Sequence, residues 1–170
     1  GLGQDFKLPF LDPTPEDIPS TFVDSRMIEK YFDKPLVVGN STVNNGLILP
    51  ESQNHPLMDP SIFSALSNPC DIQYSITGTW ALMIGFAVGL PPLWNIDTGE
   101  SGIGIFGLMD QGSNNGRGMI PSIPNPWTRI HAGWETPTEY SSPQTINLTN
   151  LKKNSIAKIF LNDPEYFLIE

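Results

Sequence analysis

The chain has 170 residues, with 9 Lys and Arg against 18 Asp and Glu, which gives a formal net charge of −9. This length is enough for one domain with its own core. The acidic balance excludes nucleic-acid binders that rely on a basic face, and it argues against docking on anionic lipid. Glycine (15) and proline (17) are frequent while hydrophobic residues make up 39%, so we expect a turn-rich but folded chain.

Few residues are available for cysteine or histidine chemistry. A single cysteine, Cys70, excludes an intrachain disulfide framework, and two histidines, His55 and His131, exclude a three-histidine metal site within one chain. The longest apolar run, Trp80 to Leu90, is too short to span a membrane. The chain lacks an initiator Met and stops inside an expected strand, so we expect residues 1–170 to be a single domain from a longer protein.

The first third of the chain predicts short elements. Residues 1–20 are proline-rich and predict an extended surface arm. Residues 21–32 place Phe22, Ile28 and Phe32 near one face, which predicts a helix that ends before Pro35. After it we expect a short strand over 35–39, turn residues over 40–46 and an apolar tetrad over 47–50. A polar loop over 51–60 and a short helical or irregular stretch over 62–66 follow.

The segment from Trp80 to Val88 predicts a helix. Thr77 or Thr79 suits its N-cap, while Gly89 and the two prolines after Leu90 suit its end. The predicted helix is apolar on every face. We therefore expect it to lie buried in the centre of the domain.

The C-terminal half is rich in glycine and proline. Residues 94–118 predict tight turns and close backbone approaches. Pro126 suits the first turn of a short helix and Gly133 suits its end. Strands are expected over 145–148, 155–161 and 166–170.

Three segments in this half share their order and spacing with a known family. They are Gly89-Leu90-Pro91 after the apolar helix, then GIFGLMDQGS over 104–113, then PWTRIHAGW over 126–134. Together they resemble the secreted, metzincin-related metallopeptidases of the immune-inhibitor-A type. In that family an H-E-x-x-H-x-x-G-L-P helix precedes a G-x-F/W-x-L-M-D-x-G-S turn and a P-x-x-W-x-R-x-x-x-G-W segment.

The resemblance implies a partial metallopeptidase-like α+β domain. Its expected features are a central buried helix, short strands and an irregular Gly/Pro-rich C-terminal half. It also implies a secreted or cell-surface bacterial protein. By the same resemblance, Met109 corresponds to the Met-turn residue beneath the metal, and without a metal we expect it to pack under the helix. Asp110 is expected to accept N–H bonds from the turn around it.

The departure from the family concerns the metal ligands. Counting back from Gly89, Leu82, Met83 and Phe86 stand where the family has its first His, catalytic Glu and second His. Zinc catalysis needs imidazole nitrogens one helical turn apart and a carboxylate base, which these side chains lack. We therefore expect no catalytic residues and no zinc. The predicted function is an inactive metallopeptidase-like domain with a structural, assembly or binding role.

Two further functions stay open. An active hydrolase would use a metal with His55, Asp97, Glu100 or His131. A calcium-stabilised carbohydrate or peptide binder would hold the ion at Asp97 and Glu100, whose loop has closely spaced oxygen donors.

Trp94, Trp127, Trp134 and Tyr140 are either an exposed platform for sugars or peptides, or buried anchors. His131 is expected to pack or cap rather than react. The expected partners are other segments of the parent protein or like subunits, with a possible oligomer, no nucleic acid and no membrane span.

Overall fold

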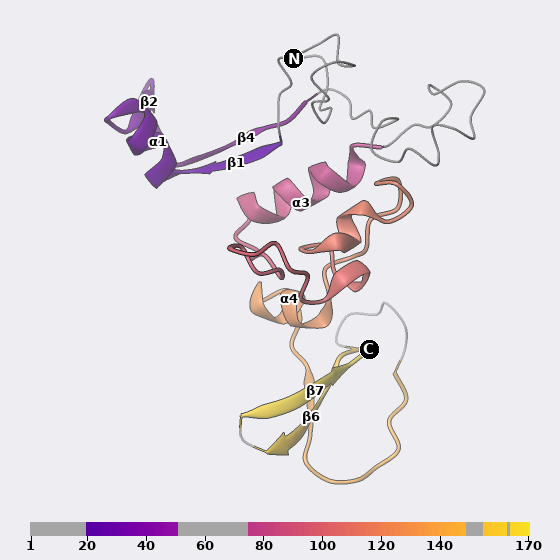
Figure 1. The fold of residues 1–170 in the computed structure, drawn as a ribbon. Helices are drawn as coiled ribbons and strands as arrows, with labels where there is room; N and C mark the ends of the chain where they lie inside the picture. Colours follow the sequence, from indigo (N-terminus) through magenta and orange to yellow (C-terminus); the bar gives the residue numbers. More distant parts are fainter. Residues whose placement is uncertain (1–19, 51–74, 149–154, 163) are drawn as a thin grey trace, which may run out of the picture.

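The computed structural model describes residues 20–50, 75–148, 155–162 and 164–170. Within them the chain is α+β, as predicted. Figure 1 shows helix α3 between the β1–β4 strand pair on one side and the glycine-rich loops on the other, with α4 and the C-terminal sheet beyond those loops. Three predicted segments and one candidate residue lie outside the described residues: the arm over 1–20 except for residue 20, the polar loop over 51–60, the stretch over 62–66, and His55.

The N-terminal part holds one helix and two strand pairs: β1 (Thr21–Asp24), α1 (Ser25–Phe32), β2 (Leu36–Val38), β3 (Ser41–Val43) and β4 (Asn45–Ile48). Strand β1 pairs antiparallel with β4, and β2 pairs antiparallel with β3. The prediction of a helix from Thr21 was therefore wrong for its first four residues. Helix α1 starts later because the Asp24 side chain caps it, accepting the Met27 N–H at 2.9 Å.

The predicted turn over 40–46 is only partly correct. The β2–β3 hairpin does turn at Gly39 and Asn40, and Gly39 has a φ of 60°. Asn45 and Gly46, however, belong to β4, where they pair with Asp24 and Val23. The strand that was predicted over 35–39 is confirmed as β2.

Helix α3 (Thr77–Ala87) ends as predicted but begins differently. Gly89 has a φ of 88°, its N–H bonds to the Phe86 carbonyl at 3.0 Å, and the Leu90 N–H bonds to the Gly85 carbonyl at 2.9 Å. This is the Schellman arrangement, which glycine favours. At the other end the N-cap is Ile76, whose side chain makes no cap bond, and the Thr77 N–H bonds to the Ser75 hydroxyl at 3.2 Å, so the expected threonine cap is wrong.

The expectation that α3 is buried all round is also wrong in the described part of the chain. Trp80, Ile84 and Val88 remain 45%, 48% and 57% exposed. They are spaced four residues apart, so they form one apolar stripe along the helix. The buried positions on α3 are Gly78 and Gly85, where the glycine-rich loops approach the backbone closely.

The glycine-rich region forms short 3₁₀ turns and then a helix: η2 (Gly104–Phe106), η3 (Gln111–Asn114) and α4 (Pro126–His131). The prediction for α4 is confirmed at both ends. Pro126 lies in its first turn, Asn125 caps it by accepting the Thr128 N–H at 2.8 Å, and Gly133 has a φ of 71°.

The C-terminal sheet has three strands: β5 (Thr138–Tyr140), β6 (Ala157–Asn162) and β7 (Glu165–Ile169). Strand β6 is central, parallel to β5 and antiparallel to β7. The strands predicted over 155–161 and 166–170 are confirmed as β6 and β7. Residues 145–148 form no strand, and β5 was not predicted, because β6 takes its second partner from 138–140 instead.

The described core is small and is built around α3. Leu90, Leu108 and Met109 form its buried cluster, against which several half-buried side chains of α3 and the loops pack. None of the described helices has both the length and the apolar character of a membrane span.

Candidate functional site

The positions on α3 that correspond to metal ligands lie in apolar packing. Leu82 and Phe86 pack against the Leu90–Leu108–Met109 cluster. The Phe86 ring also stacks on Phe22 of β1, with centroids 6.0 Å apart and an interplanar angle of 25°. On another side it meets Trp94 edge-on at 5.8 Å. The side of α3 around Phe86 is therefore filled by aromatic and aliphatic carbon.

These residues do not fit a zinc ion. Leu82 and Phe86 have no lone pairs, and the thioether of Met83 is neither a good zinc ligand nor a base. In the described part of the chain, no three His, Cys, Asp or Glu side chains come together in a group that could hold a metal. His131 therefore does not join Asp97 and Glu100, and His55 lies outside the described residues.

Met109 lies directly beneath α3, as predicted. Its side chain is fully buried, and a Cβ atom added at Gly85 would come within 2.5 Å of the Met109 sulfur. Glycine at this helix position thus lets the methionine approach the backbone closely. The contact joins the helix to the turn that follows it.

Asp110 organises that turn by accepting backbone N–H groups, which confirms the prediction. Its Oδ2 atom accepts from the backbone N–H groups of residues 102–104 at 3.0, 2.8 and 2.8 Å and from the Ser101 hydroxyl at 2.8 Å. Its Oδ1 atom accepts from the Gln111 N–H at 2.8 Å. Burial raises the pKa of Asp110, but these donors lower it more, so the pKa lies below its ordinary value of 3.8. The carboxylate is held as an anion by successive N–H groups.

The loop with Asp97 and Glu100 is closed by its own hydrogen bonds. The Asn95 side-chain oxygen accepts the N–H groups of Asp97 and Thr98 at 2.9 and 3.1 Å. The Asn95 N–H bonds to the Glu100 carbonyl at 2.8 Å. Asp97 and Glu100 are exposed. Calcium binding by these two carboxylates stays a prediction.

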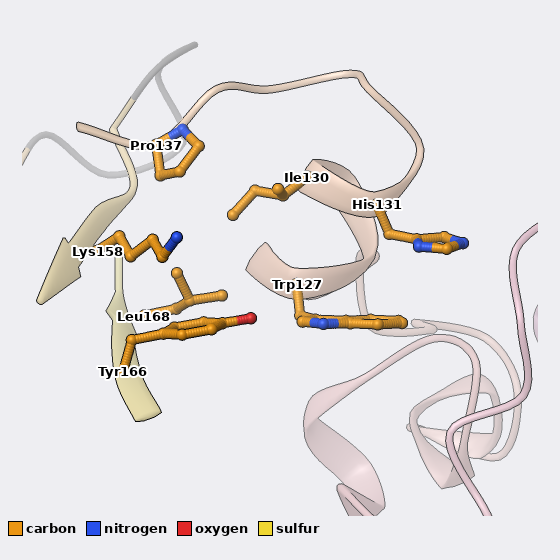
Figure 2. A pocket seen from close by; sticks show the side chains of 7 residues that line it. All are labelled: Trp127, Ile130, His131, Pro137, Lys158, Tyr166 and Leu168. Atoms are coloured by element: carbon orange, nitrogen blue, oxygen red, sulfur yellow. The ribbon is translucent and has the colours of Figure 1, made fainter. Parts of the chain in front are cut away.

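A pocket of about 240 Å³ lies between α4 and the C-terminal sheet (Figure 2). Helix α4 contributes Trp127, Ile130 and His131 to its lining, and the segment before β5 contributes Pro137. Strand β6 contributes Lys158, and β7 contributes Tyr166 and Leu168. The sheet register explains the last three, because Lys158 lies opposite Leu168 and Tyr166 is two residues before Leu168 on the same face of β7.

Lys158 is the cationic group of this pocket. Its ammonium lies 4.8 Å from the centre of the Tyr166 ring and 4.5 Å from that of Phe160. It also lies 3.1 Å from a carboxylate oxygen of Glu139, which is 58% exposed. An ion pair this exposed contributes little to stability. Lys158, whose side chain is 23% exposed, therefore lines the pocket with Glu139 as its counter-ion.

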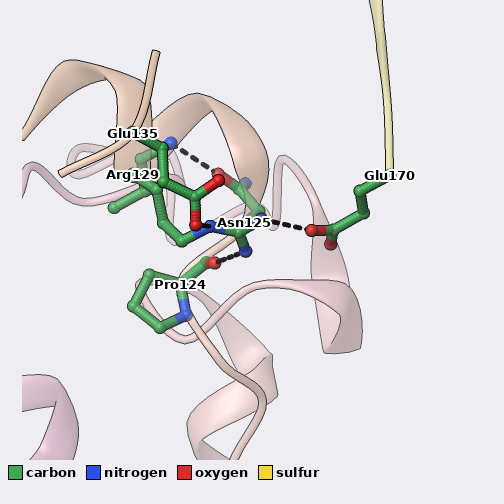
Figure 3. A network of polar contacts seen from close by, with 6 residues as sticks. Pro124, Asn125, Arg129, Glu135 and Glu170 are labelled. Atoms are coloured by element: carbon green, nitrogen blue, oxygen red, sulfur yellow. Dashed lines mark hydrogen bonds and ion pairs between the residues drawn. The ribbon is translucent and has the colours of Figure 1, made fainter. Parts of the chain in front are cut away.

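Arg129 connects α4 to the end of the sheet (Figure 3). Its guanidinium donates to the Pro124 carbonyl at 2.7 Å, lies 3.1 Å from Glu135, and forms an ion pair with Glu170. The Arg129 side chain is only 12% exposed. This network fixes α4 relative to β7, and thus fixes the two walls of the pocket.

Trp94 and Trp127 do not share one platform. Trp94 packs on Phe86 beside α3, while Trp127 stacks on His131 with centroids 5.0 Å apart and an interplanar angle of 10°. Packing of His131 is thereby confirmed. Trp127 is neither a buried anchor nor part of a set with Trp94, since it is 38% exposed and lines the pocket.

Lys158 and Tyr166 were not singled out by sequence reasoning. The available signal was the alternation along β7, which puts Tyr166, Leu168 and Glu170 on one face. That signal does not show which element covers the face.

No family model, no curated protein and no solved structure matches this chain. The resemblance to the immune-inhibitor-A type of metallopeptidase thus rests on the three sequence motifs alone.

Proposed function

We propose that this chain is a catalytically inactive metallopeptidase-like domain of a secreted or cell-surface bacterial protein, with a structural, assembly or binding role. The observation that supports it best is the apolar packing of Leu82 and Phe86 on α3. Both side chains are partly buried against the core cluster, and Phe86 also joins the ring cluster with Phe22 and Trp94. Side chains that stabilise the fold by burial take the place of groups that would hold a metal.

Exposed apolar surface supports the assembly role. On α3 the stripe of Trp80, Ile84 and Val88 stays about half exposed. Large contiguous apolar patches on a folded chain mark interaction surfaces. The partners that we propose are other segments of the parent protein or like subunits.

The edge of the C-terminal sheet offers a second contact. Strand β7 pairs with β6, and no other described strand pairs with its outer edge. Phe167 and Ile169 on this strand are 57% and 45% exposed. An edge strand with exposed apolar side chains is a template for pairing with another chain.

The test of inactivity is a metal and activity assay on the purified chain. We expect no stoichiometric zinc and no chelator-sensitive cleavage of a denatured protein substrate. One zinc per chain together with peptidase activity that a chelator removes would contradict the proposal.

The assembly role is tested by sedimentation of the chain over a range of concentrations. We expect association that Ile84→Glu weakens, because it places a charge in the apolar stripe. Gln111→Glu is the matched control, since Gln111 is exposed, polar and outside the stripe. A monomer at all concentrations would exclude like subunits as the partner.

A further inference from the structure

The pocket between α4 and the C-terminal sheet has the chemistry of a small-molecule site that is separate from α3. Figure 2 shows the Lys158 ammonium and the Tyr166 hydroxyl directed into the space between the strands and α4, where the nitrogen-bearing edge of the Trp127 indole also lies. Within the described residues, neither the Tyr166 hydroxyl nor the Trp127 indole N–H has a hydrogen-bond partner. Three donors therefore face one space.

These donors select an anionic acceptor. An ammonium and an indole N–H can only donate, and a phenol hydroxyl donates readily to a carboxylate. Lys158 supplies the positive charge of the lining and is paired with Glu139, which a ligand has to displace. Arg129 does not line the pocket, and its guanidinium is engaged with Pro124, Glu135 and Glu170. One charge with neutral donors matches a monoanion better than a phosphate dianion.

The remaining walls select an apolar body of limited size. Ile130, Pro137 and Leu168 contribute aliphatic surface, and Trp127 contributes an aromatic ring. The volume of about 240 Å³ equals that of roughly eight water molecules, which suits a ligand of about ten non-hydrogen atoms.

We propose that this pocket binds a carboxylate on a flat or branched apolar body of amino-acid size. The carboxylate accepts from Lys158 and Tyr166, and the apolar body lies against Trp127, Ile130 and Leu168. Glu139 competes with the ligand for the ammonium, because its carboxylate lies 3.1 Å from Lys158. The proposal does not depend on whether α3 lacks a metal.

The experiment is an NMR titration of the chain with phenylacetate, following the indole N–H signal of Trp127, which Trp127→Phe assigns. We expect saturable binding in the millimolar range or tighter, and at least about tenfold weaker binding of phenylacetamide, which has the same shape without the charge. Equal binding of the acid and the amide, or no shift of the Trp127 signal, would overturn the proposal.

Three variants locate the charge. Lys158→Met should weaken phenylacetate binding by about tenfold, and Glu139→Gln should strengthen it severalfold by removing the competing carboxylate. Lys30→Met is the matched control, because Lys30 also lies over an aromatic ring, that of Tyr31, but on α1. An effect of Lys30→Met equal to that of Lys158→Met would contradict the assignment.

The source of the carboxylate is decided with peptides. We compare phenylacetate with Ala-Ala-Phe bearing a free C-terminal carboxylate and with the same peptide amidated. Tighter binding of the free-acid peptide identifies a chain terminus as the natural ligand. Binding of phenylacetate without binding of either peptide identifies a free small acid.

Discussion

Gly85 of α3 lies so close to Met109 that a methyl group at this glycine would reach within 2.5 Å of the methionine sulfur. Met109 is fully buried and belongs to the core cluster with Leu90 and Leu108. The helix and the turn beneath it are therefore fitted to each other at this point. A change in side-chain size here must shift the core.

Gly85→Ala should lower the free energy of unfolding by up to about 2 kcal/mol, because overpacking against Met109 costs about 1–3 kcal/mol and the higher helix propensity of alanine offsets about 1 kcal/mol of it. Urea unfolding measures the change. Gly46→Ala on β4 is the control, since nothing lies within 4 Å of a Cβ at that position. Similar losses for both variants would contradict this account.

Asp110→Asn should destabilise the chain by about 2–4 kcal/mol, because the amide replaces a charged acceptor of several hydrogen bonds. If the asparagine NH₂ faces the N–H groups of residues 102–104, it cannot accept their hydrogen bonds, and these backbone donors lose their acceptor. Thermal unfolding of the variant at neutral pH measures the loss. A stable Asp110→Asn protein would show that the bonds to the carboxylate contribute little.

The lowered pKa of Asp110 also predicts how the free energy of unfolding depends on pH. Its pKa in the folded state lies below the unfolded value, because the N–H donors outweigh the effect of burial. The stabilisation is therefore complete above the unfolded pKa of about 3.8 and is lost as the pH falls through the lower folded value. Unfolding midpoints measured between pH 6 and pH 2 should fall more steeply for the native chain than for Asp110→Asn.

Arg129→Lys should destabilise the packing of α4 on the sheet by about 1.5–3 kcal/mol, because an ammonium cannot replace the planar fork that reaches Pro124, Glu135 and Glu170. Hydrogen exchange of the β7 amides reports the loosening. Arg26→Lys is the control, since Arg26 is exposed and pairs only with the neighbouring Asp24 among the described residues. Unchanged exchange in Arg129→Lys would contradict the role of the network.

If Asp97 and Glu100 bind calcium, adding calcium should raise the melting temperature of the chain modestly. For a site with millimolar affinity, 10 mM calcium would add about 1.4 kcal/mol, or about 3–6 °C for a chain of this size. Asp97→Asn should abolish the rise, and magnesium should not reproduce it. A melting temperature that does not change with calcium would remove this prediction.

Local signals in the sequence predicted the helix ends and the Asp110 turn. Gly89 and Gly133 mark helix ends through their own backbone conformation, and Pro126 marks a start. The donors to Asp110 lie within nine residues of it in the sequence. The glycine-rich turn around Asp110 was therefore enough to predict that its carboxylate accepts their hydrogen bonds.

Pairing between distant segments was harder to predict. Thr21 to Asp24 fits the pattern of a helix, but these residues are a strand because β4 pairs with them. The face of α3 that carries Trp80 could not be recognised as exposed, since an apolar sequence does not show which elements pack on it. The pocket was missed for the same reason, because Lys158 and Trp127 meet only when the sheet packs on α4.

The Asp110 bonds also bear on the order of folding. The bonds to its Oδ2 atom span six to nine residues and the bond to Oδ1 spans one, whereas Thr138 of β5 pairs with Ala157 across a longer stretch of chain. Closing a short loop loses less chain entropy and happens faster than closing a long one. We therefore expect the Asp110 turn to form early as a local nucleus, and the parallel β5–β6 pair to assemble late.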